Sequence, residues 1–251
     1  MAGQITSPFF KFEFLRILHA APFEGAEIGE CLDAVHDVKD GDSDSWYNAW
    51  QGAAVRSQAL AEDAAAAGDV ESQRWCLLRS SHYLRSSETL LHLNPNDPRI
   101  LSTSVKAVEL FRRAMALLDS KVYHLEIPYE DHTLPAYLYM PTDASRMKGK
   151  IPLIVQTGGY DSTQEELYFF VAAAARKRGY AVLTFEGPGQ GLMIRKYQKH
   201  LRPDWEVVIS KVLDFVCSTS HDHPELELDL DRLCLTGNSM GGYFALRGAV
   251  E

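Results

Sequence analysis

The chain is 251 residues long, enough to bury a full core in one large domain or two smaller ones. Its composition, 46% hydrophobic and 24% charged, is typical of a soluble globular protein, and a formal net charge of −9 argues against nucleic acid or an anionic membrane as the main partner. No apolar stretch approaches the roughly 18 residues that span a bilayer.

The four cysteines are widely scattered. They have neither the paired spacing of a zinc site nor the density of a disulfide scaffold, so no metal is expected and free thiols in a reducing compartment fit best. The N-terminal stretch lacks a cationic start followed by a long apolar run, which argues against a secretory signal. These features together predict a cytoplasmic protein.

Residues 1–119 carry apolar residues at helical spacing and no strand signal, so we predict a helical unit. Gly68–Asp69 and Asn94–Pro98 are expected to separate helices. One predicted apolar face comprises Trp46, Trp50, Ala53, Ala54 and Ser57. A second comprises Leu101, Val105, Val108, Met115 and Leu118.

Aromatic residues of this helical unit exceed what its own core is expected to need. We therefore predict that the unit determines specificity and that its aromatic side chains line a pocket for an apolar substrate, with Trp46 as a candidate substrate-binding residue. These aromatic residues are Trp46, Trp50, Trp75, Tyr83 and Phe111. The alternative is that these aromatic residues only attach the helical unit to the rest of the chain.

Residues 120–251 change to a strand and helix alternation. Two extended runs, 122–129 and 134–140, predict a hairpin. The elements expected next are strands at 151–156, 180–185 and 232–236, alternating with helices around 167–175, at 204–218 and from 241 onward. The predicted inward faces of the first two helices comprise Leu167, Phe170, Val171, Ala174 and Ala175, and Val208, Val212, Phe215 and Val216. This order is typical of a mostly parallel sheet wrapped by helices, so we predict an α/β class.

Gly237-Asn238-Ser239-Met240-Gly241 fits the G-x-S-x-G pattern of a nucleophile elbow, between a predicted strand and a predicted helix. A serine on so tight a turn needs glycine two residues to either side, because larger side chains would collide with neighbouring backbone. The pattern predicts Ser239 as a catalytic nucleophile, and the Met240 N–H as a donor to an oxyanion at the start of the helix.

A second glycine pair, in Thr157-Gly158-Gly159-Tyr160-Asp161-Ser162, follows the first strand of the parallel series. In an α/β-hydrolase fold this loop supplies another oxyanion N–H. The candidate donors are the backbone amides of Tyr160 and Gly159, and Asp161 is a candidate substrate-binding residue.

Glu186-Gly187-Pro188-Gly189-Gln190-Gly191 follows the next strand. It lacks the G-x-G-x-x-G pattern and the P-loop lysine, so a rigid loop at the active-site rim is expected rather than a phosphate site. Glu186 is a candidate substrate-binding residue. It could hydrogen-bond within the rim or be a solvated residue at a strand end, and the sequence favours neither.

The acid and histidine of an α/β-hydrolase triad are expected after the serine, yet no Asp or His follows Ser239. His124 and His132 on the hairpin, and His221 and His223 before Pro224, are expected to be surface or loop residues. The sheet also lacks the strands that should follow the elbow helix. We therefore expect the chain to be a truncated part of a longer protein.

The three motifs in this order resemble the 2,6-dihydropseudooxynicotine hydrolase group of α/β-hydrolases, which includes fungal yellowish-green-type hydrolases that shorten polyketides during pigment formation. The motif residues are Gly158–Glu166, Glu186–Gly191 and Asp231–Gly242. The resemblance implies hydrolysis of a C–C bond (retro-Claisen type) or an ester without a cofactor. It also implies a helical cap over the active site and a homodimer.

The sequence thus predicts a serine hydrolase acting on a polyketide-like small molecule in secondary metabolism, with an N-terminal cap (1–119) and a catalytic domain (120–251). One alternative is an acyltransferase or lactone-forming cyclase that uses the same acyl-enzyme and excludes water. Another, from a different class, is a non-catalytic binding module.

Overall fold

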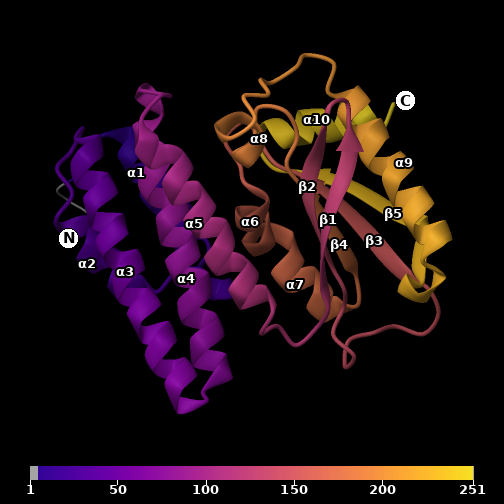
Figure 1. The fold of residues 1–251 in the computed structure, drawn as a ribbon, viewed down its shortest axis with the longest axis horizontal. Helices are drawn as coiled ribbons and strands as arrows, with labels where there is room; N and C mark the ends of the chain where they lie inside the picture. Colours follow the sequence, from indigo (N-terminus) through magenta and orange to yellow (C-terminus); the bar gives the residue numbers. More distant parts are fainter. Residues whose placement is uncertain (1–4, 251) are drawn as a thin grey trace. The chain divides into compact units, whose positions relative to one another are not determined.

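The computed structural model describes residues 5–250. Glu251, at the expected point of truncation, lies outside the described residues. The chain divides into two compact units, Met1–Leu118 and Asp119–Glu251 (Figure 1). Between residues 5 and 250, no helix is both long enough and apolar enough to cross a membrane.

The first unit is helical. Its α-helices are α1 (Pro8–Leu18), α2 (Ile28–His36), α3 (Ser43–Ala67), α4 (Val70–Glu88) and α5 (Pro98–Met115), with 3₁₀ turns at Ala21–Phe23 and Thr89–Leu93. Polar side chains set the helix starts: Asp42, Asp69 and Asp97 each accept a backbone N–H from the first turn of the helix that follows. Gly68 ends α3 with a φ of 74°, which glycine adopts without steric cost.

The predicted apolar face of α3 is confirmed, because all five of its residues are buried. The predicted face of α5 is wrong, since Leu101 and Val105 are exposed. The buried side of α5 carries Ile100, Thr103, Ser104, Ala107, Leu110, Phe111, Ala114 and Met115. The small residues on this side of α5 let α4 approach closely, and Ser81 Oγ donates to the carbonyl of Ala107 at 2.7 Å. Hydrophobic periodicity alone does not reveal a face of this kind.

The second unit contains a five-stranded sheet in the order β1-β2-β4-β3-β5. Its strands are β1 (Val122–Tyr129), β2 (His132–Tyr139), β3 (Ile151–Thr157), β4 (Ala181–Phe185) and β5 (Leu228–Gly237). β1 and β2 form the predicted antiparallel hairpin, and β2 pairs antiparallel with β4. β3 lies between β4 and β5 and is parallel to both, as the strand and helix alternation predicts.

Two helices cover one face of this sheet, α9 (Glu206–Asp222) and α10 (Met240–Gly248) (Figure 1). Their apolar residues join those of the strands in one core, in which Trp205 stacks on Phe244 with ring centroids 4.1 Å apart. The predicted inward face of α9 is confirmed, with Val208, Val212 and Val216 buried and Phe215 packed against the core.

The helical segment 164–178 is not the uniform helix that the sequence predicts. It runs through α6 (Gln164–Leu167), a π-helical turn (Tyr168–Ala172), α7 (Ala173–Ala175) and a 3₁₀ turn (Arg176–Arg178). The π-helical turn shifts the side-chain register, so the predicted inward residues Phe170, Val171 and Ala174 are only half-buried. Tyr168 and Phe169 are buried instead, and Tyr168 packs on Tyr139 of β2.

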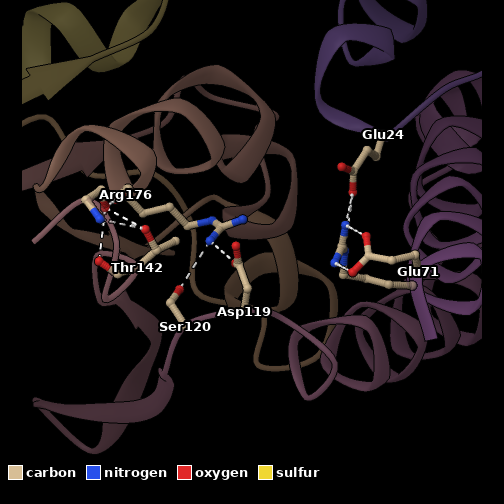
Figure 2. A network of polar contacts seen from close by, with 8 residues as sticks. Glu24, Glu71, Asp119, Ser120, Thr142 and Arg176 are labelled. Atoms are coloured by element: carbon tan, nitrogen blue, oxygen red, sulfur yellow. Dashed lines mark hydrogen bonds and ion pairs between the residues drawn. The ribbon is translucent and has the colours of Figure 1, made fainter.

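A buried arginine anchors each unit internally. Figure 2 shows Arg176 with Asp119, Ser120 and Thr142 and, in the other unit, Glu24 and Glu71. In the second unit the Arg176 guanidinium pairs with Asp119 and donates to Ser120 Oγ at 3.3 Å, while its carbonyl accepts from the Thr142 N–H. In the first unit Arg74 bridges Glu24 and Glu71, at 3.0 and 2.7 Å. Each arginine therefore fastens loops of its own unit to a helix.

The segment α8 (Gly191–Arg195) completes the second unit, together with a 3₁₀ turn at Pro224–Leu226.

Candidate active site

The three parallel strands end level with one another. Thr157, the last residue of β3, pairs with Phe185 at the end of β4 and with Gly237 at the end of β5. The loops that follow these strands therefore emerge at the same edge of the sheet, where α/β proteins place their ligands. All three glycine-containing motifs of the sequence lie in these loops.

Ser239 occupies the tight turn between β5 and α10. Its backbone φ of 54° and ψ of −126° form a combination that residues with side chains adopt only under strain. The turn is closed by the Gly241 N–H, which donates to the Asn238 carbonyl at 2.8 Å, and by the Gly242 N–H, which donates to the Ser239 carbonyl at 3.0 Å. This is the backbone geometry of a nucleophile elbow, with an exposed serine at a helix N-terminus.

The two flanking glycines are required by close backbone approach. A Cβ on Gly237 would lie 2.1 Å from the Gly241 carbonyl oxygen, and a Cβ on Gly241 would lie 2.5 Å from the Thr157 carbonyl oxygen. Both clashes involve backbone that cannot move without disrupting the turn or β3. The G-x-S-x-G pattern is therefore a packing requirement in this structure.

The loop after β3 lies directly against the serine. A Cβ on Gly159 would come within 3.3 Å of Ser239 Cβ and 3.5 Å of Ser239 Oγ. The Gly159 N–H is already engaged, because it donates to Ser162 Oγ at 3.0 Å. Of the two amides predicted for this loop, the Tyr160 N–H therefore remains the candidate oxyanion donor. The Met240 N–H begins α10, where a helix offers no intrahelical acceptor.

Glu186, at the end of β4, is buried with 1% of its surface exposed. Its carboxylate accepts the Leu192 N–H at 2.8 Å and the Gln164 N–H at 3.2 Å, so it fastens two loops together. Gly191 must lack a side chain, because a Cβ there would lie 1.9 Å from Glu186 Oε1. The alternative of a solvated residue is wrong, and the predicted contact between Glu186 and a substrate is not supported, because no carboxylate surface is left for it.

Burial, and after it the negative charge of Glu165, raise the pKa of Glu186 from its ordinary 4.5 to about 8. The Leu192 N–H, the Arg195 guanidinium and the Gln164 N–H oppose this shift without cancelling it. Glu165 is itself buried and accepts a hydrogen bond from the Tyr137 hydroxyl at 3.0 Å. The folded protein therefore holds a proton near this pair at neutral pH.

We expect the thermal stability of the protein to fall as pH rises from about 5 to about 8. In this range unfolded Glu186, with its ordinary pKa of 4.5, has lost a proton that the folded state keeps. Glu165→Gln preserves an acceptor for Tyr137 and removes the charge, so the pKa of Glu186 should drop. Each unit of that drop recovers about 1.4 kcal/mol of unfolding free energy above pH 8.

Unfolding temperatures measured from pH 5 to pH 9 check this expectation. The Glu165→Gln curve should be flatter than that of the unmodified protein, whereas Glu109→Gln, at an exposed carboxylate on α5, should leave the shape unchanged. Parallel curves for all three proteins would show that the two buried carboxyl groups do not interact.

Two other candidate residues differ in their placement. Asp161 is half-buried in the loop after β3, next to Tyr160, whose side chain is 59% exposed. Trp46 is completely buried in the first unit, where its indole N–H donates to the Ser86 carbonyl at 2.9 Å and its ring packs edge-on against Phe10. Trp46 therefore has no exposed surface for a substrate, and its predicted role as a substrate contact is contradicted.

The hairpin and loop histidines named in the sequence analysis lie away from the serine. His221 and His223 precede β5, whose first residue, Leu228, pairs with Ile151 at the start of β3, about 20 Å from the end of that strand beside the elbow. His132 is on β2, which is separated from β5 by β4 and β3 in the sheet order, about 14 Å at ordinary strand spacing. The described residues after Ser239 include neither an acid nor a histidine.

Two glutamines that the sequence did not single out support the site. Gln156 Nε2 donates to Asn238 Oδ1 at 2.8 Å, which connects β3 to the elbow. Gln190 Nε2 donates to the carbonyls of Gly158 and Gly159, at 2.7 and 2.8 Å. Their partners are 82, 32 and 31 residues away, so no local pattern could have revealed them.

A family model described as "Esterase FrsA-like" matches residues 22–248, nearly the whole chain. The chain belongs to the FrsA-like family. The crystal structure of 2,6-dihydroxy-pseudo-oxynicotine hydrolase superposes on this FrsA-like chain with a TM-score of 0.74 and 25% sequence identity, covering 92% of the chain and 60% of that structure. The predicted α/β-hydrolase fold is thereby confirmed.

Fungal hydrolases are more similar in sequence. The 20-hydroxy-prefusarin hydrolase FUS2 of Gibberella moniliformis is 54% identical over 98% of this chain and 58% of its own length. The alpha/beta hydrolase psoB of Aspergillus fumigatus is 51% identical over 98% of this chain and 56% of its own length. The predicted family resemblance is confirmed, and the chain spans less than two thirds of each of these relatives.

Proposed function

We propose that the FrsA-like chain carries the nucleophile of a serine hydrolase, and that this nucleophile is Ser239. The observation that carries the proposal is the strained turn at Ser239, flanked by glycines that admit no side chain and faced by the loop after β3. A turn kept in a costly conformation at a helix N-terminus favours a chemical role over a structural one.

In this mechanism Ser239 Oγ gives its proton to a base and attacks a substrate carbonyl, which forms a tetrahedral oxyanion. Collapse of the oxyanion breaks the bond to the alcohol or enolate leaving group, which takes up that proton, and water then hydrolyses the acyl-enzyme and frees Ser239. The N–H groups of Tyr160 and Met240 stabilise the oxyanion. We propose that a histidine and an acid from outside residues 1–251 activate the serine. A family-length protein has room for them, because this chain spans 58% of the first relative described above.

The proposed substrate is a polyketide-like carbonyl compound of fungal secondary metabolism, cleaved at an ester or, by a retro-Claisen step, at a C–C bond. The relative named 20-hydroxy-prefusarin hydrolase supports this class. C–C cleavage requires a leaving carbanion that is stabilised as an enolate, so a β-diketone is the diagnostic substrate. Turnover of an ester but not of the matching β-diketone would restrict the proposal to ester hydrolysis.

The proposal is tested by labelling the active family-length protein with a fluorophosphonate and locating the adduct by peptide mass spectrometry. We expect one adduct, on Ser239, that forms in step with loss of activity and does not form on heat-denatured protein. An adduct on another residue, or complete inactivation without an adduct on Ser239, would refute the assignment of the nucleophile.

A further inference from the structure

The Gln190 side chain is buried between two of the loops at the active-site edge, with 1% of its surface exposed. Its Nε2 donates to the Gly158 and Gly159 carbonyls, at 2.7 and 2.8 Å, and its Oε1 accepts the Gly187 N–H at 2.9 Å. These contacts need two donors on one atom and an acceptor on the other, which is the inventory of a side-chain amide. Gln190, which lies in the loop after β4, therefore fixes the position of the loop after β3.

The Gly159 carbonyl belongs to the same peptide group as the Tyr160 N–H. A trans peptide is planar and points its C=O and N–H in opposite directions, and no cis peptide occurs in the described chain. Fixing the Gly159 oxygen consequently fixes the direction of the Tyr160 N–H. The preceding peptide is fixed at both ends, because the Gly158 carbonyl binds Gln190 and the Gly159 N–H binds Ser162 Oγ.

Such fixing is needed because glycine backbone is otherwise free to rotate. Gly158 and Gly159 have no Cβ to restrict their dihedral angles. Gly159 also has to lie close to Ser239, where a Cβ would already come within 3.3 Å of the serine Cβ. The loop needs glycine for this approach, and hydrogen bonds restrict it instead: the Gly159 carbonyl accepts Gln190 Nε2 at 2.8 Å and, at a longer 3.4 Å, the Ser162 N–H of the loop itself.

We propose that Gln190 is a positioning residue, which holds the Gly159–Tyr160 peptide so that the Tyr160 N–H meets the oxyanion formed at Ser239. The inference rests on the proposed function of Ser239. The Tyr160 N–H that Gln190 positions stabilises negative charge that develops only in the transition state. Loss of the Gln190 contacts should therefore lower kcat more than it raises KM.

Gln190→Glu is the decisive variant, because it keeps the shape of the side chain and the acceptor for Gly187. It replaces the double donor with an oxygen that faces two carbonyl oxygens. We expect kcat for p-nitrophenyl acetate to fall about 100-fold at pH 8, as for loss of an oxyanion donor, with KM changed by less than about threefold. Because the introduced carboxyl group can donate one hydrogen bond when it is protonated, the ratio of variant to unmodified kcat should rise as pH is lowered.

Gln198→Glu is the matched control, since Gln198 is exposed a short distance along the chain and should change neither kcat nor its pH profile. If Gln190→Glu does not fold, Gln190→Met keeps the side-chain length without charge, and the same fall in kcat at unchanged KM is expected. Failure of both variants to fold would assign Gln190 to the fold as a whole and overturn the inference.

Fluorophosphonate labelling separates this inference from the proposed function. If Ser239 is labelled and Gln190→Glu retains kcat within about threefold with an unchanged pH profile, the positioning role is wrong and the nucleophile stands. If Ser239 is not labelled in the active protein, the proposed function fails and the role of Gln190 fails with it. Slower labelling of Ser239 in Gln190→Glu, with an unchanged melting temperature, supports both.

Discussion

Replacing Ser239 with alanine is expected to lower kcat/KM for p-nitrophenyl acetate by about ten-thousand-fold or more in the family-length protein. A nucleophile acts with its base as a unit, so the remaining oxyanion donors cannot sustain turnover without it. Alanine has a Cβ like serine and adopts a φ of 54° at a similar cost, so the melting temperature should change little. Initial rates and thermal unfolding of the same preparation check both statements.

Ser218→Ala supplies the comparison for this variant. Ser218 is exposed on α9, a helix that ends at the opposite edge of the sheet from the elbow, and its loss should leave kcat/KM unchanged. If Ser239→Ala keeps more than about a tenth of the activity, Ser239 is not the nucleophile. A preparation that loses activity together with its melting transition would point to a structural role for the elbow.

Trp46→Ala is expected to destabilise the protein by about 3–5 kcal/mol. The ring is fully buried, with its centroid 5.4 Å from that of Phe10 and 5.6 Å from that of Trp50, so truncation leaves a cavity in the core of the first unit. It also leaves the Ser86 carbonyl without the indole donor. Activities toward a small ester and a large substrate should fall together, in proportion to the folded fraction.

Trp75 offers a matched tryptophan, since it lies on α4 and is 45% exposed. Trp75→Ala should cost less than about 1 kcal/mol in the same urea or thermal unfolding experiment. If Trp46→Ala instead leaves stability unchanged and selectively lowers kcat/KM for the large substrate, the hypothesis that this aromatic cluster determines specificity is restored.

Sequence patterns that involve only neighbouring residues were sufficient to predict the nucleophile elbow. Gly237, Ser239 and Gly241 lie within five residues, and the backbone contacts that exclude other side chains are determined by that turn and by the neighbouring strand β3. The helix ends at Gly68 and Asp69 were predictable for the same reason, because caps depend on residues a few positions apart. Sequence patterns of this range predicted the sheet, its parallel part and the position of the candidate nucleophile.

Features that depend on contacts between distant segments were not predictable. Glu186 could be solvated or buried on sequence grounds, and the loops that bury it only meet in the folded chain. The aromatic residues Trp46 and Trp50 suggested a pocket, but Phe10, Phe14 and Tyr83 from other helices cover them. The buried face of α5 is lined by small residues, which a search for large apolar side chains passes over.

The left-handed backbone at residue 239 has a consequence for how this chain responds to selection and to design. Glycine would adopt the same dihedral angles without penalty, whereas a serine there costs roughly 1–3 kcal/mol of folding free energy. Screens that reward only heat resistance or expression should therefore drift toward glycine at this position, which raises stability and removes the proposed nucleophile. A stabilisation campaign on this family has to hold position 239 fixed.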